Sequence, residues 1–381
     1  MKLTSYIAGS WIEGAGEGKT VVDAVRGETV CAVTSDGIDM ATAVQFARDV
    51  GGSKLRAMTF HERAAALKAT AKHLMEKKEQ FYDISFKTGT TRADAWPDIE
   101  GGIGTVFSYA GVVNREFPND AVLVEGPLER LSPQGTFIGR HILTPKVGVA
   151  VHINAYNFPV WGMLEKMAPC LAAGMPVIVK PATQTAYLTH AVVAEIVKCG
   201  ALPEGAIQLI CGATGDLFNH LNEQDVVTFT GSATTGQSLR CHPNIIANSI
   251  PFTMAADSLN CAILGQSVRP DDEEFTIFIK EVVREMTGKA GQKCTAIRRI
   301  IVPTDKVTAV TEALKKRLAK TTMGDPAEEG VRMGPLLGAQ QKADVHANVM
   351  ALAEHCDLLI GGDDNFELVG KRAVKDAFYP P

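Results

Sequence analysis

Cys294 stands in the stretch GQKCTAIRR, between a glycine turn and a cluster of basic residues. The basic residues nearest to it along the chain are Lys289, Lys293, Arg298 and Arg299. Positive charge close to a cysteine favours the thiolate, which is the form that attacks an electrophilic carbon. The stretch therefore predicts a nucleophile, although a lone cysteine in an α/β protein is more often a buried structural residue.

The chain has eight cysteines, and no two of them form a CxxC pair. This scatter argues against a zinc site and against a disulfide framework, so no metal is expected. Most of these cysteines are predicted to be small buried hydrophobic residues.

The bulk composition predicts a globular protein with a large core. Of the 381 residues, 46% are hydrophobic and 21% are charged, which is enough to build two or more lobes. A net charge of -5 provides no basic field for nucleic acid or an anionic membrane surface. No apolar run reaches the ~20 residues of a membrane span, and the start MKLTSYIAGSW lacks the apolar core of a secretory signal. A cytoplasmic location is therefore expected.

Strand and helix patterns alternate through the middle of the chain. Residues 37–115 show helical spacing of apolar residues, and the apolar runs GVAVHINA, PVIVK, IQLICG and VVTF then alternate with helical stretches. Continuous apolar strands are typical of a parallel sheet covered on both faces. The pattern predicts the α/β class, with a doubly wound, Rossmann-type lobe that binds a nucleotide cofactor.

A second α/β lobe is predicted after about residue 250, from the strands NCAIL and RIIVP and the helices that adjoin them. The segment ERLSPQGTFIGRHILTPK predicts an extended ribbon that either pairs with a neighbouring subunit or forms an ordinary surface hairpin. We therefore predict a cofactor-binding domain of residues 1–122 and 146–249, an oligomerisation ribbon of 123–145 and a catalytic domain of 250–381. The GAGEGK stretch at 14–19 is predicted to be a hairpin turn between Trp11–Ile12 and Val21–Val22, not a phosphate loop.

Four short motifs occur in a particular order: NFP at 157–159, KPA at 180–182, FTGSATTG at 229–236 and GQKC at 291–294. Their order and spacing resemble the aldehyde dehydrogenase superfamily over essentially the whole chain. The resemblance implies an aldehyde dehydrogenase-like fold and a homo-oligomer, a dimer or larger. The stretches HINAYNFP, WGMLEKMAP, ADSLN and GQKCTAIRR resemble those of family members from phenylacetate and benzoyl-CoA degradation. Those members act on semialdehydes linked to coenzyme A.

The resemblance also implies catalytic roles. Cys294 would attack the aldehyde carbon, and the side-chain amide of Asn157 with the backbone N–H of Cys294 would stabilise the oxyanion. Asn157 also fits a helix N-cap ahead of Pro159. Glu165 and Lys166 align with positions near the nucleophile, and the alternative is a pair of charges on a solvated face.

The cofactor assignments rest on the same resemblance. Lys180 would reach the adenosine ribose, and a helix N-terminus would face the pyrophosphate. Thr183 stands where relatives that prefer NAD commonly carry glutamate, so NADP is expected to bind more tightly than NAD. The remaining residues assigned to the cofactor are Gly212, Gly231, Ser232 and Gly236. Simple turns are the alternative explanation for Gly231 and Gly236.

The chain departs from the family at Ala255, which stands where the family carries the glutamate that activates water for deacylation. Alanine has no group that accepts a proton. An engineered substitution is the favoured explanation, and a natural change toward coenzyme A as acyl acceptor is the alternative. A third hypothesis, of another class, is a protein that binds or assembles without catalysis.

The end of the chain differs from the family as well. The second lobe of relatives continues past Tyr379–Pro381, so we expect a chain that is cut short. In the phenylacetate relatives a fused hydratase domain follows the aldehyde dehydrogenase domain.

Overall fold

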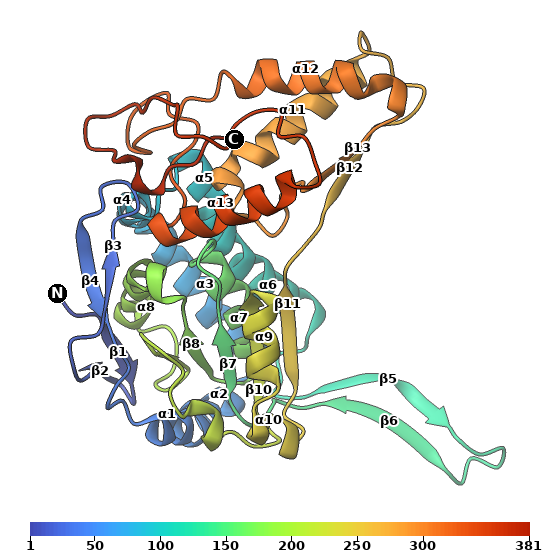
Figure 1. The fold of residues 1–381 in the computed structure, drawn as a ribbon. Coiled ribbons are helices and arrows are strands. Elements are labelled where there is room, and N and C mark those ends of the chain that lie inside the picture. Colours follow the sequence, from blue (N-terminus) through green and yellow to red (C-terminus); the bar gives the residue numbers. More distant parts are fainter. The chain divides into compact units, whose positions relative to one another are not determined.

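The computed structural model describes residues 1–381, which form two compact units (Figure 1). The first unit comprises residues 1–20, 31–81 and 97–256, and the second comprises 21–30, 82–96 and 257–381. Residues 21–30 and 82–96, which the sequence analysis assigned to the cofactor-binding domain, thus belong to the second unit. One physical reason is backbone pairing, since Val374 N–H donates to the carbonyl oxygen of Val25 at 3.0 Å.

The first unit is built on a seven-stranded sheet with the order β11-β10-β7-β8-β9-β1-β2. The five strands from β11 to β9 are parallel, and β1 and β2 add an antiparallel edge. Each of the predicted apolar runs forms one of the parallel strands, as expected for strands that are covered on both faces. The bounds are Thr4–Ile7 (β1), Ser10–Glu13 (β2), Ala150–Ile153 (β7), Val177–Lys180 (β8), Ile207–Leu209 (β9), Val226–Gly231 (β10) and Phe252–Ala256 (β11).

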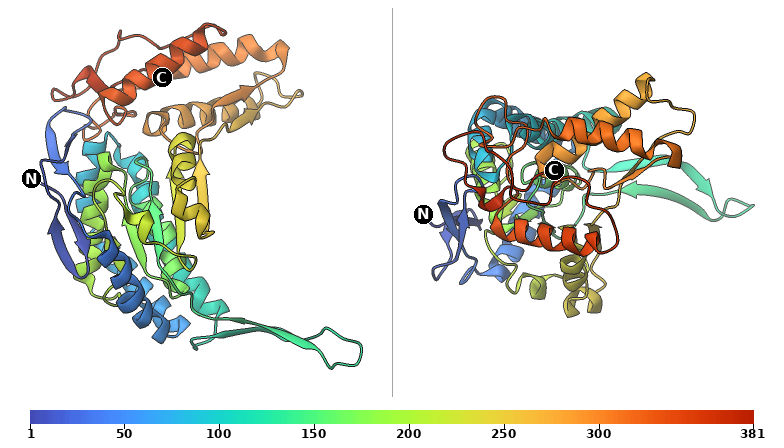
Figure 2. Two further views of the ribbon diagram at one scale, coloured as in Figure 1. Left: turned by 60° about the horizontal axis from the view of Figure 1, so that its bottom comes forward. Right: turned by 45° about the horizontal axis from the view of Figure 1, so that its top comes forward.

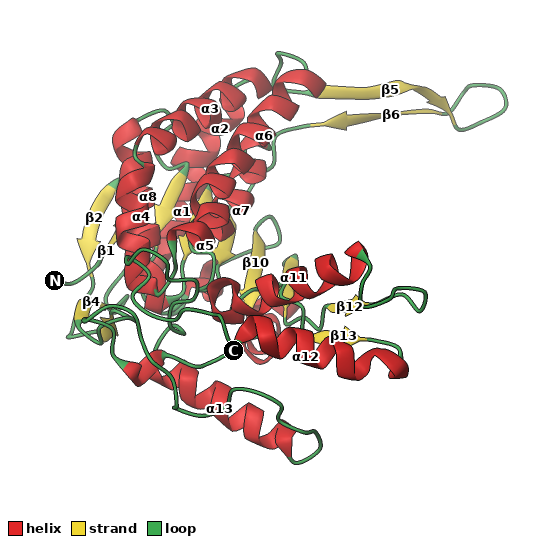
Figure 3. Ribbon diagram, turned by 90° about the horizontal axis from the view of Figure 1, so that it is seen from above, coloured by secondary structure: helices red, strands yellow, loops and turns green.

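Helices cover both faces of this sheet. One face packs on α1 and α10 through a core that includes Val151, Ile153 and Phe229. The other face lies under a layer of α3, α6, α7 and α8, which pack on one another (Figure 3). The bounds are Met40–Phe46 (α1), Ser53–Ala57 (α2), Phe60–Glu76 (α3), Lys78–Ser85 (α4), Gly102–Glu116 (α6), Trp161–Ala172 (α7), Ala186–Cys199 (α8), Ala233–Arg240 (α9) and Pro243–Ala247 (α10).

Arg63 of α3 joins the C-terminal ends of two other helices inside this layer. Its side chain is buried, and it donates to the carbonyl oxygens of Ala172, Leu55 and Met58 at 2.8, 3.1 and 2.7 Å. These carbonyls lie at the C-terminal ends of α7 and α2, where helices leave acceptors unsatisfied and favour positive charge.

The predicted ribbon is an antiparallel pair, β5 (Leu123–Arg130) and β6 (Ile138–Leu143). It extends away from the rest of the first unit in both views of Figure 2, and nearly all its residues are exposed. Its exposed apolar side chains include Val124, Leu128 and Ile142.

The prediction of a hairpin around GAGEGK is wrong. β2 pairs with β1, whereas β3 (Lys19–Val22) pairs with β4 (Thr29–Val33), so the two arms do not pair with each other. The chain between them runs against β4: a Cβ on Gly14 would lie 2.4 Å from the carbonyl oxygen of Thr34. The stretch is also not a phosphate loop, because a strand and not a helix follows it.

The second unit contains a two-stranded parallel sheet, β12 (Cys261–Ile263) and β13 (Arg299–Ile301), which confirms the predicted strands NCAIL and RIIVP. α11 (Glu273–Thr287) and α12 (Val307–Leu318) lie beside these strands (Figure 3), and both contribute to a small core around Phe275 and Val310. α5 (Arg92–Trp96) and α13 (Ala339–Ala353) complete the helices.

The start predicted for the second lobe, at about residue 250, differs from the structure. β11 is an edge strand of the first unit's sheet, because it pairs in parallel with β10 along its whole length. No helix of the chain combines the length and the apolar character that crossing a bilayer requires.

Candidate functional site

The sheet of the first unit has a topological switch point between β7 and β10. From β7 the chain proceeds through β8 and β9 on one side, and then through β10 and β11 on the other. At such a point the crossover helices leave on opposite faces, and ligands of open α/β sheets bind outside the carboxyl ends of the strands. The predicted cofactor residues and the segment with Asn157 all follow carboxyl ends of these strands.

Asn157 lies between β7 and α7 and is half-buried. Its alternative role as a helix N-cap is not seen, because α7 begins at Trp161 and its N-cap position is Val160. A distant carboxylate takes the capping role: Asp98 Oδ1 accepts from the backbone N–H groups of Val160 and Trp161 at 3.1 and 2.8 Å. Asp98 is buried, so the helix entrance is anchored from within the unit.

Glu165 and Lys166 lie one turn into α7. Lys166 Nζ donates to Glu165 Oε1 and to the carbonyl oxygen of Gly162, both at 2.9 Å. The side chain of Lys166 is only 13% exposed, against 42% for Glu165. A pair of charges on a solvated face therefore does not describe Lys166.

Lys180 ends β8 and is held in a largely buried place, where burial lowers the pKa of its ammonium group. The nearby Cys211 partly opposes this effect by raising the pKa of Lys180. No carboxylate pairs with the lysine. A half-buried cation without an anionic partner fits the hydroxyl and phosphate groups of a dinucleotide. Thr183 follows at the first position of a short 3₁₀ turn, Thr183–Thr185, and is half-buried.

The glycine-rich segment forms the turn from β10 into α9. Ser232 is the N-cap of α9, and its hydroxyl accepts from the backbone N–H of Thr235 at 3.3 Å. Gly231 and Gly236 pack against an aromatic ring: a Cβ on either would lie within 3.0 Å of Phe229 side-chain atoms. Close packing therefore accounts for both glycines, and the N-terminus of α9 remains as the group suited to a phosphate.

Gly212 and Ala255 complete the predicted set of the first unit. A Cβ on Gly212 would lie 2.4 Å from the backbone nitrogen of Ser35, so a close backbone approach requires this glycine. Ala255 is exposed on β11 and pairs with Thr230 of β10.

Cys294 belongs to the second unit and is exposed, on the loop after α11. The loop begins with three consecutive residues in the left-handed region, Lys289, Ala290 and Gly291, with φ of 51°, 52° and 73°. Asp94 of α5 accepts from the backbone N–H of Lys289 at 2.9 Å. Left-handed backbone is costly for residues other than glycine, so the loop is held in shape by its contacts.

Two side chains bind the backbone of the cysteine itself. Asn260 Nδ2 donates to the carbonyl oxygen of Cys294 at 2.6 Å, and the hydroxyl of Ser258 donates to the same oxygen. Gln292 anchors the loop on the other side, because its Oε1 accepts from the backbone N–H of Leu337 at 3.1 Å. The peptide around Cys294 is thereby held from both sides.

The basic residues near Cys294 have other partners. Lys293 forms an ion pair with Glu285 at 2.7 Å. Arg298 donates to the carbonyl oxygen of Lys293, and Arg299 donates to that of Leu259. These cations therefore shape the loop and neutralise a carboxylate, a role that their spacing along the chain does not reveal.

Of the eight cysteines only Cys31 and Cys211 are buried, so the prediction that most of them are buried is wrong. Burial raises the pKa of the Cys170 thiol to about 12, and burial also raises the pKa of the Cys211 thiol, with Cys31 as a second cause. Neither thiol ionises near neutral pH, so neither is a candidate nucleophile. Cys241, Cys261 and Cys356 are exposed, as Cys294 is.

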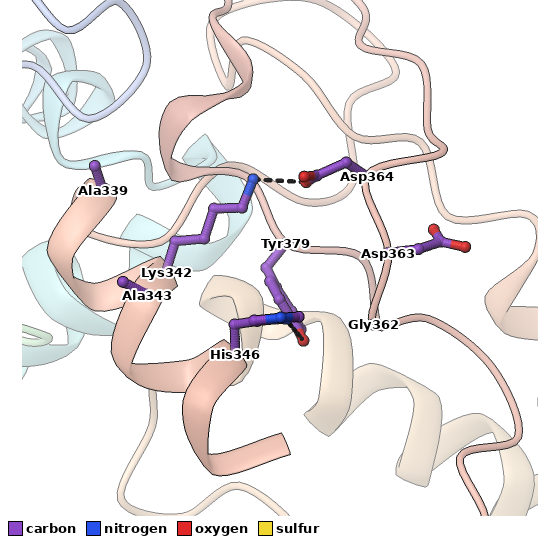
Figure 4. Close-up of a pocket in the computed structure, with 8 residues that line it drawn as sticks. All are labelled: Ala339, Lys342, Ala343, His346, Gly362, Asp363, Asp364 and Tyr379. Carbon is purple, nitrogen blue, oxygen red and sulfur yellow. Dashed lines mark hydrogen bonds and ion pairs between the residues drawn. The ribbon is translucent and has the colours of Figure 1, made fainter. Parts of the chain in front are cut away.

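A cavity of about 320 Å³ lies elsewhere in the second unit, between α13 and the segment around Asp364 (Figure 4). Inside it, Lys342 pairs with Asp364 at 2.7 Å, and His346 Nδ1 lies 3.2 Å from the hydroxyl of Tyr379. None of the sequence-predicted site residues lines it.

Comparison with known proteins decides the family. Residues 11–381 match the sequence profile of the aldehyde dehydrogenase family. The chain belongs to the aldehyde dehydrogenase family. It is 47% identical to a 3,4-dehydroadipyl-CoA semialdehyde dehydrogenase of Aromatoleum evansii, over 100% of this chain and 74% of that protein. It is 26% identical to a glutarate-semialdehyde dehydrogenase of Pseudomonas putida, over 94% of this chain and 72% of that protein.

The fold agrees with this assignment. A betaine aldehyde dehydrogenase of Staphylococcus aureus superimposes with a TM-score of 0.86 at 23% identity, covering 100% of this chain and 74% of that one. A second structure of that enzyme, in complex with NAD⁺, has a TM-score of 0.84 and covers 100% and 73%. The chain is thus an oxidoreductase with an aldehyde dehydrogenase fold.

Several residues that build these sites were not found from the sequence. Asp98 and Asp94 act across more than 60 positions of the chain, so local patterns carry no sign of them. Asn260 and Gln292 lie within the quoted stretches ADSLN and GQKC and could have been considered there.

Asp98 generates a prediction for this site. Asp98→Ala removes the acceptor of two N–H groups at the start of α7, the buried one of Val160 and the partly buried one of Trp161, so we expect a loss of about 2–3 kcal/mol in the unfolding free energy. Asp98→Asn keeps one acceptor oxygen and should recover part of it. Asp39→Ala, at the exposed N-cap of α1, is the matched control with the smaller loss. Urea titration followed by circular dichroism measures all three, and equal midpoints for Asp98→Ala and Asp39→Ala would contradict the role of Asp98.

Proposed function

We propose that this aldehyde dehydrogenase oxidises a semialdehyde linked to coenzyme A, in aromatic degradation of the benzoate or phenylacetate type. The observation that carries the proposal is the 47% identity, over the full chain, to a relative named for a semialdehyde of that kind. The other relatives named above are less similar and act, by their names, on free aldehydes.

Cys294 is assigned the role of nucleophile. Its thiolate sulfur forms a bond to the aldehyde carbon, and the carbonyl electron pair moves to the oxygen, where N–H donors such as that of Asn157 stabilise the charge. The carbon then loses hydride with its electron pair, and the carbonyl reforms as a thioester. The exposure of Cys294 and the double anchor on its carbonyl oxygen support this role. We further assign Glu165 and Lys166 to the surroundings of this reaction, as a coupled pair on α7.

The bound dinucleotide supplies the acceptor for the hydride. Lys180 supports its binding as a half-buried cation that no carboxylate neutralises. The turn of Gly231, Ser232 and Gly236 supports it as well, because it presents the N-terminus of α9 at the carboxyl end of β10. Gly212 follows β9, and its lack of a side chain lets the backbone there pass close to Ser35.

We expect NADP to bind more tightly than NAD, because Thr183 brings no negative charge against a 2′-phosphate. Thr183→Glu should lower NADP affinity by about tenfold or more and spare NAD, since like charges at close range cost more than ~1.4 kcal/mol. Calorimetric titration with both cofactors measures this. Gln184→Glu adds the same charge at an exposed neighbour and is the control. Tighter binding of NAD by the unaltered chain would refute the preference.

Ala255 is proposed to stand at the position of the deacylating base. Loss of a general base slows its step by roughly 10²–10⁴-fold, so the thioester on Cys294 should accumulate. With NADP and a coenzyme A-linked semialdehyde, we expect a burst of about one NADPH per chain, then slow turnover. Intact mass spectrometry should find the acyl group on the Cys294 peptide, and Ala255→Glu should restore steady NADPH formation.

The alternatives give different results in the same experiment. If coenzyme A is the natural acceptor, adding it to the unaltered chain releases the acyl group as a second thioester, and Ala255 is then a natural residue. If the protein only binds or assembles, no burst and no adduct appear. Steady NADPH formation by the unaltered chain, without coenzyme A, would remove position 255 from deacylation.

We infer that the ribbon β5–β6 pairs two copies of this chain. It exposes a two-stranded sheet with open edges and apolar side chains, which isolated subunits rarely present to water. Ile138→Glu with Ile142→Glu should therefore dissociate the oligomer in sedimentation velocity. His141→Glu, on the same strand and 84% exposed at its side chain, is the control and should not. A monomeric unaltered chain would overturn the inference.

A further inference from the structure

Four polar side-chain atoms of the central sheet are buried and have no hydrogen-bond partner. They are His152 Nδ1, Asn154 Nδ2, Asn154 Oδ1 and Thr228 Oγ1. His152 is completely buried, and Asn154 is 4% exposed. All three residues belong to β7, its continuation and β10, which are the two strands that border the switch point.

The register of the sheet places these side chains on one face. His152 pairs with Thr228 in the parallel ladder between β7 and β10, and paired residues of parallel strands point to the same side. Asn154 lies two residues beyond His152, and its backbone N–H still donates to Lys180 at 3.0 Å, so the strand geometry continues to it. Val151 and Phe229 point to the opposite face, into the apolar core.

α7 covers this polar face. Cys170 Sγ lies 3.4 Å from His152 Nε2, which occupies one nitrogen of the ring and leaves Nδ1. Burial, with the nearby Lys166 cation as a second cause, lowers the pKa of His152 to about 3. The imidazole is therefore neutral near neutral pH, and the set consists of uncharged donors and acceptors.

Such a set matches the hydrogen-bonding needs of water. Buried polar groups in folded proteins are nearly always satisfied, and internal water molecules satisfy those that protein atoms do not reach. An ion would leave either the donors or the acceptors unsatisfied. We propose that His152, Asn154 and Thr228 form a buried hydration site beneath α7, which supplies water to position 255.

Position 255 lies on the same face of the sheet, on the strand next to β10. Thr228 pairs with Thr253 of β11, so Thr253 points to the same face, and Ala255 does so two residues further on. The hydration site thus lies on the face of the sheet that carries position 255, separated from β11 by one strand pairing. Its link to deacylation rests on the proposed function, whereas the site itself does not.

A crystal structure of the chain that resolves ordered water tests the site directly. We expect water within hydrogen-bond distance of His152 Nδ1 and Thr228 Oγ1, and a dry face would overturn the proposal. The melting temperature of Thr228→Val is an independent test. The substitution lowers Tm by about 2–4 °C if the hydroxyl binds water, and it raises Tm if the hydroxyl has no partner. Thr185→Val is the control, because the Thr185 hydroxyl is also buried without a partner but lies outside this sheet.

Kinetics in the Ala255→Glu background tests the link. Thr228→Val should lower the steady rate of NADPH formation, relative to the burst amplitude, by roughly tenfold, the effect of about one hydrogen bond. Ordered water combined with an unchanged ratio would overturn the supply of water to position 255. Failure of Ala255→Glu to turn over would overturn the role of position 255 and this link, while the crystal structure would still decide the site.

Discussion

The parallel pairing of β7 with β8 on one side and β10 on the other is the constraint on which the first unit depends. It brings the carboxyl ends of three strands to one edge and sends α7 and α9 to opposite faces of the sheet. Lys180, Ser232 and the segment with Asn157 then share that edge, although up to 75 positions separate them along the chain (232 − 157 = 75). A slip of one residue in this register would exchange the polar and apolar faces, so the apolar core itself maintains it.

α7 connects this edge to the rest of the unit, and buried charges hold both of its ends. The carboxylate of Asp98 accepts from its N-terminal N–H groups, and the guanidinium of Arg63 donates to Ala172 at its C-terminus. The signs match the helix dipole, with negative charge at the N-terminus and positive charge at the C-terminus. The helix also carries Lys166 over the polar face of the sheet, so its axial position decides where that charge lies.

The sequence predicts the parts of this structure that depend on local pattern. The strands β7, β8 and β10 are recognisable as continuous apolar runs, and the helix α11 is recognisable from the spacing of its apolar residues. Both signals lie within one stretch of the chain. The GAGEGK hairpin is wrong because β2 already pairs with β1 across the two residues Ala8 and Gly9, and β3 pairs with β4. Likewise, a helix cap was the alternative role for Asn157, but Asp98 accepts from the N-cap residue Val160 across 62 positions of the chain.

The role of the cations around Cys294 could not be predicted from the sequence either. Four cations near one cysteine indicate an activated thiol, yet Lys293 pairs with Glu285 and two arginines bind carbonyl oxygens. What distinguishes this loop is its backbone, because Lys289 and Ala290 adopt left-handed conformations that cost about 1–2 kcal/mol each. Asp94 offsets part of that cost from outside the loop, because it accepts from the backbone N–H of Lys289, and Gln292 within the loop accepts from the backbone N–H of Leu337. The contacts therefore hold the strained turn that leads to Cys294, and Ser258 and Asn260 hold its carbonyl oxygen, which is the arrangement expected where a nucleophile has to be presented in one orientation.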